Sequence, residues 1–290
     1  MKIRELFGSS RQILSFEIFP PKRDGSLDTV FDTIEQLGDL KPAFISVTYG
    51  ANGSGAKGTT VQIADAIKNK YGMETMAHLT CLNHDREEID EVLQSLSSCG
   101  VENVLALRGD RNPDVQPKNV FSHASDLVSY VKSRGDFHVS GACYPEVHAE
   151  SADAVADVLN LKKKVDAGAE HLISQLFFDN SVFYSFRERC RIAGVNVPIE
   201  AGIMPVTNAK QIQRMVTLCG ASFPAKFSKI IQRYGDNPEA LEDAGIAYAV
   251  DQIVDLLTNG VDGIHLYTMN RPEVAKKITS AVGKLFSQGQ

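Results

Sequence analysis

Several features that mark specialised protein classes are missing from this 290-residue sequence. No apolar run reaches the ~18 residues that a membrane-spanning helix needs. The first 19 residues carry several charges and no long apolar block, so they do not resemble a secretory signal. Basic residues number 30 against 36 acidic ones, which excludes a sequence-wide basic surface for nucleic acid. We therefore expect a cytoplasmic protein with neither membrane nor nucleic acid among its partners.

Cysteine and histidine patterns typical of disulfide frameworks and metal sites are also missing. The five cysteines are odd in number and widely spaced, and no CxxC pair occurs. This disfavours a disulfide framework or a zinc knuckle and favours reduced thiols. The sequence has no HxH or HExxH pair, and His78, His148 and His265 are far apart along the chain. We expect no metal site.

What is present is a regular alternation of short β-rich apolar runs with amphipathic helical stretches, unbroken by any linker. This alternation predicts βα units and a parallel sheet. The predicted strands are Ile13–Phe19, Phe44–Thr48, Glu74–Leu79, Asn103–Leu107, His138–Cys143, His171–Gln175, Ile199–Ile203 and Gly263–Tyr267. Successive strand ends leave room for one βα unit each, at ~30 residues a unit. The last gap is longer and has room for extra helices at about 208–218, Ala225–Tyr234 and Pro238–Asn259.

Eight strands each followed by a helix predict an α/β fold of the (β/α)8 TIM-barrel type, with extra helical segments before the last strand. One domain over residues 1–290 fits the length, and a doubly wound open sheet is the structural alternative. Ser26 and Asp85 can cap helices, and Pro272 suits the first turn of the last one. A further helix is predicted over Ser151–Ala167. Its expected inner face is Val155, Val158, Leu159 and Val165.

The active site of such a barrel lies at the carboxyl ends of its strands. Nearly every predicted strand ends in a polar or ionisable residue. The set comprises Glu17, Thr48, Tyr49, His78, Arg108, Gly109, Asp110, Tyr144, Glu146, His148, Gln175, Met204, Pro205, Tyr267, Asn270 and Arg271. An idle charge inside an apolar run is costly to bury. These ends therefore predict the location of the chemistry.

Glu17 is the only charge in its strand, and a desolvated carboxyl can act as a general acid near neutral pH. The structural alternative pairs it with a buried Arg or Lys. Arg108-Gly109-Asp110 can hold a phosphate and a polar ring edge, or can be an ordinary charged turn.

Two further patterns bear on ligands. Asp157, Asn160 and Lys164 share a helix stripe beside the run Lys162–Lys164, which is either a solvated face or a diphosphate-binding edge. The glycine-rich segment Gly50–Gly55 lacks GxGxxG, and we predict no helix directly after it, so no Rossmann dinucleotide site is expected.

Eight short motifs occur in order at the predicted strand ends. They are Phe16-Glu17-Ile18-Phe19-Pro20-Pro21-Lys22, Val47-Thr48-Tyr49-Gly50-Ala51, Ala77-His78-Leu79-Thr80, Leu107-Arg108-Gly109-Asp110, Tyr144-Pro145-Glu146-Val147-His148, Gln175-Leu176-Phe177-Phe178-Asp179, Gly202-Ile203-Met204-Pro205-Val206 and Tyr267-Thr268-Met269-Asn270-Arg271. Together they resemble bacterial 5,10-methylenetetrahydrofolate reductases over nearly the whole chain.

This resemblance implies a flavoprotein oxidoreductase of one-carbon metabolism. It implies a barrel that binds FAD non-covalently and uses NADH or NADPH to reduce 5,10-methylenetetrahydrofolate to 5-methyltetrahydrofolate by a ping-pong route. Glu17 resembles the general acid and Asp110 the residue beside flavin and pterin. Gln175, Tyr267 and Arg271 resemble substrate contacts. The flavin-contacting positions by resemblance are Thr48, His78, Arg108, Gly109, Asp110, Tyr144, His148, Asp157, Asn160, Lys163 and Lys164.

At one position this sequence departs from the pattern of the enteric enzymes. Ala209 stands where the enteric pattern has a phenylalanine, which bears on how nicotinamide binds. The resemblance implies a homo-oligomer without the C-terminal regulatory domain of eukaryotic enzymes, and hence no inhibition by S-adenosylmethionine. Two other hypotheses are a flavin-free barrel lyase or aldolase and a non-catalytic subunit. The predicted strands contain no lysine for a Schiff base, and Glu17, Asp110 and Gln175 are all present.

Overall fold

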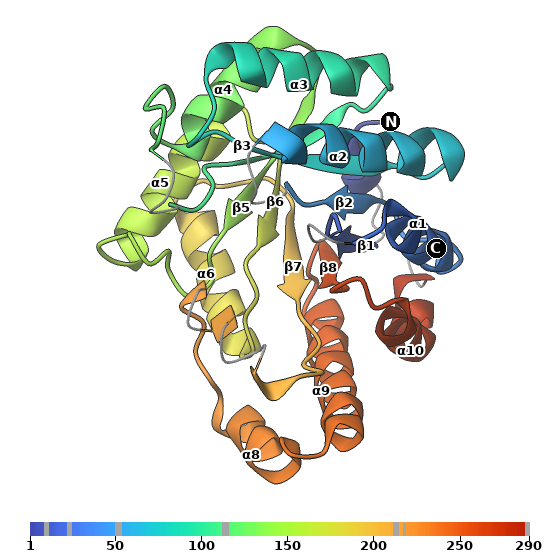
Figure 1. Ribbon diagram of the computed structural model, residues 1–290. Helices are drawn as coiled ribbons and strands as arrows, with labels where there is room; N and C mark the ends of the chain where they lie inside the picture. The colour runs from blue at the N-terminus through green and yellow to red at the C-terminus, as the bar shows by residue number, and fades with distance from the viewer. Residues whose placement is uncertain are drawn as a thin grey trace.

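The computed structural model describes residues 1–8, 12–21, 25–49, 54–111, 116–210, 215–216 and 219–287. Eight parallel strands close into a barrel in which each strand pairs with the next and β8 pairs with β1 (Figure 1). The strands are β1 (Ile13–Ile18), β2 (Ile45–Val47), β3 (Thr75–Thr80), β4 (Asn103–Leu107), β5 (His138–Cys143), β6 (His171–Ser174), β7 (Ile199–Ile203) and β8 (Gly263–Tyr267). The predicted (β/α)8 barrel is confirmed, and its closure excludes the open sheet.

Helices surround the barrel and cover the outer faces of its strands (Figure 1). The α-helices are α1 (Leu27–Gly38), α2 (Ser54–Asp65), α3 (Arg86–Ser98), α4 (Ala124–Arg134), α5 (Ala154–Asp166), α6 (Asn180–Ile192), α8 (Ala225–Tyr234), α9 (Pro238–Thr258) and α10 (Pro272–Val282). Short helical turns are η1 (Ile3–Gly8), η2 (Ala66–Lys70) and η3 (Gly283–Ser287). Within the described ranges, no helix has the length and apolar character needed to cross a membrane.

Two of the three extra helical segments predicted before the last strand are confirmed as α8 and α9. Helix α8 matches its predicted bounds, and α9 ends one residue earlier than predicted. The segment predicted as helical over 208–218 lies partly outside the described residues.

The predicted helix starts at Ser26 and Asp85 are confirmed by side-chain caps. The Ser26 hydroxyl accepts a hydrogen bond from the Asp28 backbone N–H at 3.0 Å. The Asp85 carboxylate accepts from the Glu88 N–H at 3.0 Å, and the Glu88 carboxylate accepts from the Asp85 N–H at the same distance. This reciprocal pair is a capping box, which satisfies two N–H groups that a helix start leaves open.

The structure corrects two helix predictions. Helix α5 starts at Ala154 with Asp153 as its N-cap, and two residues expected on its inner face, Val155 and Leu159, are 65% and 52% exposed. The prediction was wrong because it took apolar residues as the mark of the inner face, whereas that face includes the buried Asp157. Helix α2 begins at Ser54, inside the glycine-rich segment where no helix was expected, because packing on the barrel overrides the low helix propensity of glycine.

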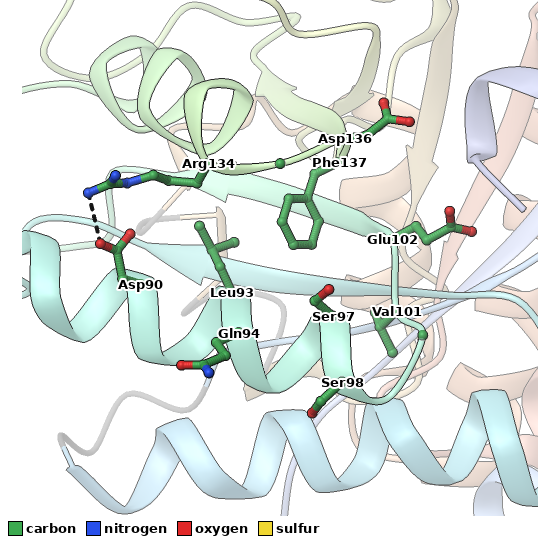
Figure 2. A pocket seen from close by; sticks show the side chains of 12 residues that line it. Asp90, Leu93, Gln94, Ser97, Ser98, Val101, Glu102, Arg134, Asp136 and Phe137 are labelled. Carbon is green, nitrogen blue, oxygen red and sulfur yellow. Dashed lines mark hydrogen bonds and ion pairs between the residues drawn. The ribbon is translucent and has the colours of Figure 1, made fainter.

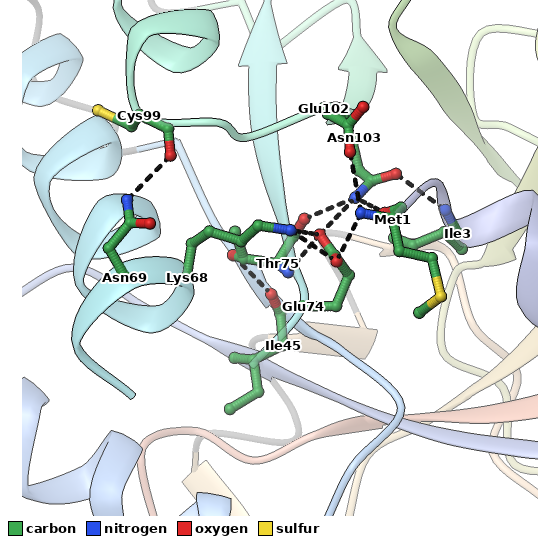
Figure 3. Close-up of polar contacts among 10 residues, drawn as sticks. All are labelled: Met1, Ile3, Ile45, Lys68, Asn69, Glu74, Thr75, Cys99, Glu102 and Asn103. Carbon is green, nitrogen blue, oxygen red and sulfur yellow. Dashed lines mark hydrogen bonds and ion pairs between the residues drawn. The ribbon is translucent and has the colours of Figure 1, made fainter. Parts of the chain in front are cut away.

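The amino-terminal segment closes the end of the barrel opposite the strand carboxyl ends. Figure 3 shows the Met1 amino group beside two carboxylates, 3.1 Å from Glu74 and 2.9 Å from Glu102. The Asn103 side chain accepts from the Ile3 N–H and donates to the Met1 carbonyl. These contacts hold η1 under the strands. A small apolar cluster then fills this end of the interior, formed by Ile3, Ile13, Phe44, Met76, Leu105 and Ile173 with Leu6 and Phe7 against it.

Candidate active site

A cavity of about 800 Å³ lies at the carboxyl ends of the strands. Residues predicted independently from eight separate motifs meet here, because the ends of parallel barrel strands converge on one mouth. Ten of the predicted site residues line it: Glu17, Thr48, His78, Arg108, Gly109, Asp110, Tyr144, His148, Gln175 and Tyr267. The mouth cavity is therefore the candidate active site.

A smaller side cavity of about 280 Å³ adjoins the mouth between the ends of β4 and β5 and helix α5. Arg108, Tyr144 and His148 line both cavities. The remaining predicted flavin-contacting residues line the side cavity alone: Asp157, Asn160, Lys163 and Lys164. The two cavities therefore adjoin at these shared residues, with Glu17 lining the mouth and the lysines lining the side cavity.

Among the residues that the resemblance assigned to the site, Arg271 is the one that lines neither cavity, and the strand-end residues Glu146, Pro205 and Asn270 line neither as well. The Arg271 guanidinium lies 2.6 Å from Glu242 on α9 and 2.7 Å from Glu273 on α10. These ion pairs hold the start of α10 against α9. Ala209 also lies outside the mouth lining, but it packs against a cluster that includes two lining residues, Leu176 and Met204.

Glu17 sits at the end of β1 with its side chain 9% exposed, between two imidazoles. Its Oε2 lies 3.6 Å from Nε2 of His78 and 3.6 Å from Nε2 of His265. Burial lowers the pKa of His78 to about 4, although the Glu17 charge opposes this shift. His78 is therefore neutral at neutral pH and does not form a permanent ion pair with Glu17. No buried Arg or Lys pairs with Glu17 among the described residues, contrary to the structural alternative.

The Tyr267 hydroxyl is held by the neighbouring strand end. It donates a hydrogen bond to the Ser174 carbonyl at 2.7 Å. Burial raises the pKa of Tyr267 well above its usual value, and the nearby Glu17 charge raises it further. Tyr267 therefore remains a neutral hydroxyl that gives the mouth wall a fixed shape.

Arg108, at the junction of the two cavities, is paired with a carboxylate that the sequence did not single out. Its two terminal nitrogens lie 2.5 and 2.9 Å from the two oxygens of Glu150. The hydrogen bond from Arg108 lowers the pKa of Glu150 to about 2. A carboxylate and a phosphate present the same two-oxygen edge to a guanidinium. Glu150 thus occupies the position beside Arg108 that an anionic group of a ligand would take.

The lysine end of the side cavity is built around a glycine. The Lys164 ammonium donates to the Ala142 carbonyl at 2.5 Å, and its aliphatic chain crosses Gly141 on β5. A Cβ at Gly141 would lie only 2.6 Å from Lys164 Cδ. Burial lowers the pKa of Lys164, while the buried Asp157 opposes that shift. Lys163 is exposed and donates to the Asn160 side chain at 3.1 Å. The stripe therefore lines the side cavity, with Asp157 buried and with Asn160 and Lys163 also exposed to solvent.

The structure adds mouth residues that were not among the predicted site residues. Tyr49 and His84 both line the cavity, with the Tyr49 hydroxyl 3.1 Å from His84 Nε2. Tyr49 was noted only as a strand-end residue, and His84 lies on the loop after β3 with no motif to mark it. Three methionines also line the mouth, of which Met204 was noted as a strand-end residue: Met204, Met215 and Met269.

A third hollow, of about 750 Å³, lies outside the barrel along α3 and the end of α4 (Figure 2). Its charged residues Asp90 and Arg134 are bonded to each other at 2.8 Å. It opens near the starts of β4 and β5, away from the mouth, and none of the predicted site residues lines it. This hollow is therefore not part of the candidate active site.

Comparison with known proteins decides the family. The profile of the methylenetetrahydrofolate reductase family matches residues 2–283. The chain belongs to this family. Curated 5,10-methylenetetrahydrofolate reductases of Pectobacterium carotovorum and Escherichia coli are each 40% identical to it over 93% of this chain and 90% of theirs. The chain is thus an enzyme of the methylenetetrahydrofolate reductase family, as the motifs predicted.

A plant enzyme and a solved bacterial structure are also similar to this chain. An Arabidopsis thaliana methylenetetrahydrofolate reductase (NADH) is 38% identical over 99% of this chain and 50% of its own length. A solved Clostridium thermocellum protein described as binding two copies of 5-methyl-5,6,7,8-tetrahydrofolic acid superposes with a TM-score of 0.71, covering 99% of this chain and 100% of that one. Its sequence identity is 15%, so this likeness shows the fold alone.

Proposed function

We propose that this methylenetetrahydrofolate reductase binds FAD across the two cavities and uses NADH or NADPH to form 5-methyltetrahydrofolate. The observation that carries the proposal is the pair of adjoining cavities, of which the mouth is lined by Glu17 and the side cavity by Lys163 and Lys164. Such a shape suits a ligand with a flat ring system at one end and a diphosphate further along. Bound FAD would accept a hydride from NAD(P)H and pass it to the folate.

Three features of the mouth and side cavity fit a flavin. The His78 Nε2 atom is buried beside the mouth cavity with no hydrogen-bond partner among the described residues, so it is available to a ring heteroatom. Gly109 has a φ of +88°, which favours glycine and lets the backbone lie against a ligand. Cations at Arg108 and Lys163 face the side cavity, where a diphosphate would need them.

The residues divide by chemistry along the site. Neutral and acidic groups around the mouth would hold the ring system: Thr48, His78, Gly109, Asp110 and Tyr144. Groups of the side cavity would hold the diphosphate and the nucleoside: Arg108, His148, Asp157, Asn160, Lys163 and Lys164. Gln175 and Tyr267 lie across the mouth and are proposed as substrate contacts. Arg271 remains a proposed folate contact only if ligand binding draws it out of its ion pairs.

Glu17 is proposed as the acid that opens the five-membered ring of methylenetetrahydrofolate. Its proton moves to a ring nitrogen as the carbon–nitrogen bond breaks, which leaves an electrophilic iminium at the methylene carbon. Asp110 lines the same cavity, and a carboxylate there stabilises the cationic centre. The reaction consumes one proton per turnover at Glu17.

Flavin binding and hydride transfer can be tested separately. The purified protein should show a flavin absorbance spectrum that bleaches when NADH is added without oxygen. A Glu17→Gln variant should still bleach, because hydride transfer from NADH needs no acid, yet it should not be reoxidised by methylenetetrahydrofolate. A protein that stays colourless after incubation with FAD would overturn the flavin assignment, and a variant with unchanged folate turnover would overturn the role of Glu17.

A further inference from the structure

The acid proposed for the folate step has no hydrogen bond to fix its side chain. Glu17 Oε2 lies 3.6 Å from Nε2 of His78 and 3.6 Å from Nε2 of His265, which is beyond hydrogen-bond length. Its carboxylate has no hydrogen-bond partner among the described residues, and it lines the mouth cavity where the folate is proposed to bind. The position of this carboxyl group therefore depends on how the backbone at the end of β1 is held.

The backbone carbonyl of Glu17 is held from the neighbouring strand β8. The register of the two strands pairs Glu17 with Tyr267, the last residue of β8. Thr268 comes next, and its hydroxyl donates to the Glu17 carbonyl at 2.6 Å, while its N–H donates to the same oxygen at 3.3 Å. Thr268 is only 3% exposed, so water hardly competes for this hydroxyl. The sheet ladder supplies the N–H contact, and the hydroxyl adds a second, shorter hydrogen bond at the same carbonyl.

Beyond Thr268 the chain turns away from the sheet in an unusual conformation. The Thr268 carbonyl accepts from the Arg271 N–H at 2.9 Å, and α10 begins at the next residue. Between them, Met269 and Asn270 have φ angles of +53° and +56°. This left-handed backbone is costly for residues other than glycine, although asparagine tolerates it better than methionine does. Such conformations persist only where surrounding contacts fix them, and they are common at active sites.

This turn brings the Asn270 side chain against the backbone of Phe19, two residues after Glu17. Asn270 Oδ1 accepts from the Phe19 N–H and Asn270 Nδ2 donates to the Phe19 carbonyl, both at 2.8 Å. Pro20 favours an extended backbone at Phe19, in which both groups point to one side, as they do in a strand. Since the chain has left β8 by this point, the amide of Asn270 takes the place of the next strand residue. The Asn270 N–H also donates to the Thr268 hydroxyl at 3.2 Å, which links the two contacts.

We propose that Thr268 and Asn270 are positioning residues for the folate reaction, which hold the backbone at and just after Glu17 and so set the place of its carboxyl group in the mouth. This inference rests on the proposed function, in which Glu17 protonates the folate. Neither Thr268 nor Asn270 lines the mouth or the side cavity. Both therefore act through the backbone of β1 and not by contact with a ligand.

The same turn joins the acid to a proposed substrate contact. Tyr267 directly precedes Thr268 and lines the mouth, where its hydroxyl is fixed on the Ser174 carbonyl at 2.7 Å. The contacts of Thr268 thus hold Glu17 at a set distance from this wall. A displacement of about 1 Å between reacting groups can cost roughly a hundredfold in rate. Loss of the contacts should therefore slow proton transfer to the folate, while Tyr267, held by Ser174, keeps its place in the wall.

Two variants remove the contacts, and each has a matched control. Thr268→Val keeps the branched shape but loses the hydroxyl that donates to Glu17, whereas Thr268→Ser keeps the hydroxyl. Asn270→Gly loses both contacts with Phe19 and suits the left-handed backbone. Its control is Asn119→Gly, because Asn119 is an exposed asparagine with a φ of +57° that lines neither cavity.

Each protein is reduced with NADH and then mixed with methylenetetrahydrofolate in a single turnover. Bleaching by NADH should stay within about twofold of the wild-type rate in every variant, because that step needs no acid. Reoxidation by the folate should slow by roughly tenfold to a hundredfold in Thr268→Val and Asn270→Gly, with little change in the folate concentration that gives half the maximal rate. Thr268→Ser should restore most of the rate lost in Thr268→Val. In the protein without ligands, hydrogen exchange at the Phe19 amide should speed up roughly tenfold or more in Asn270→Gly and not in Asn119→Gly.

A merely structural role of the turn would give a different result. Bleaching and reoxidation that slow together, or a wild-type rate of reoxidation in both variants, would overturn the positioning role. A Thr268→Ser variant as slow as Thr268→Val, or unchanged exchange at Phe19 in Asn270→Gly, would do the same. If Thr268→Val does not fold, Asn270→Gly decides alone, because it keeps a backbone conformation that glycine adopts freely. A wild-type protein that methylenetetrahydrofolate does not reoxidise would instead overturn the proposed function.

Discussion

Glu150 holds the Arg108 guanidinium through two parallel contacts at the junction of the mouth and the side cavity. The pair joins the turn after β4 to the turn after β5 and satisfies the arginine when no phosphate is bound. Because the same nitrogens would face a diphosphate, the carboxylate and the proposed cofactor compete for one cation. This relationship gives the first prediction.

Glu150→Ala should tighten FAD binding. The Glu150 side chain is 51% exposed, so the pair is worth about 0.5–1 kcal/mol, and its removal should lower the Kd for FAD by roughly two- to fivefold. The measurement is a fluorescence titration of the apoprotein with FAD. The matched control is Glu188→Ala, which removes a similarly exposed carboxylate paired with Arg191 on α6. Weaker FAD binding by Glu150→Ala would mean that Glu150 positions Arg108 for the cofactor instead of competing with it.

The same substitution should have opposite effects at two glycines. Gly141→Ala places a methyl group 2.6 Å from the Lys164 chain, so Lys164 must leave the Ala142 carbonyl. We expect a loss of about 1–3 kcal/mol in the free energy of unfolding, together with weaker FAD binding. Gly58→Ala in α2 meets no atom within 4 Å and should stabilise by about 0.5–1 kcal/mol. Urea unfolding measures both, and equal effects would contradict the assigned packing of Lys164.

Acid should destabilise the fold through two buried histidines. Burial lowers the pKa of His78 to about 4 and that of His138 to about 3, whereas both are ~6.5 when the chain unfolds. Between these pKa values the unfolded state binds more protons than the folded state. The stability that comes from keeping the two imidazoles neutral is therefore complete above about pH 6.5 and falls as the pH decreases. For each histidine, the free energy of unfolding should fall by about 2 kcal/mol between about pH 7 and about pH 5.

The variant that isolates one of these groups is His138→Gln. Its free energy of unfolding should fall less between the two pH values than that of the wild type, by about 2 kcal/mol. His123→Gln, at an exposed histidine before α4, is the control and should retain the wild-type difference. An unchanged acid sensitivity in His138→Gln would show that this ring is protonated in the folded protein.

The barrel and the mouth could be predicted because both follow local rules. Strand spacing predicted the eight βα units, and the polar residue at each strand end predicted the lining of the mouth. The outward face of α5 could not be predicted from apolar spacing, since Val155 and Leu159 face solvent while Asp157 faces a cavity. A polar stripe on a helix faces inward only where the neighbouring strand ends leave a cavity beside it, and the helix sequence does not contain that information.

The buried polar side chains of the barrel interior were missed although part of their signal is in the sequence. Glu200 is the only charge in its strand, as Glu17 is in its own, and His138 and Ser140 are spaced to share a face. These residues precede the strand ends, where no site was sought. Glu200 on β7 contacts Ser15 on β1 and His171 on the neighbouring strand β6, and spacing along one strand does not reveal contacts between strands.

With Ala209 in place of a phenylalanine, the enzyme should bind nicotinamide more weakly. The resemblance places a substrate-packing phenylalanine at this position, and here the small side chain packs against a cluster that includes Leu176 and Met204 of the mouth. Ala209→Phe should restore an aromatic face worth about 1 kcal/mol and lower the KM for NADH roughly fivefold, with little change in the KM for methylenetetrahydrofolate. Steady-state kinetics with each substrate varied in turn measures both constants, and Ala209→Leu controls for added bulk without a ring. If the leucine variant gains as much as the phenylalanine variant, simple filling of the apolar cluster explains the effect and no ring stacks on nicotinamide.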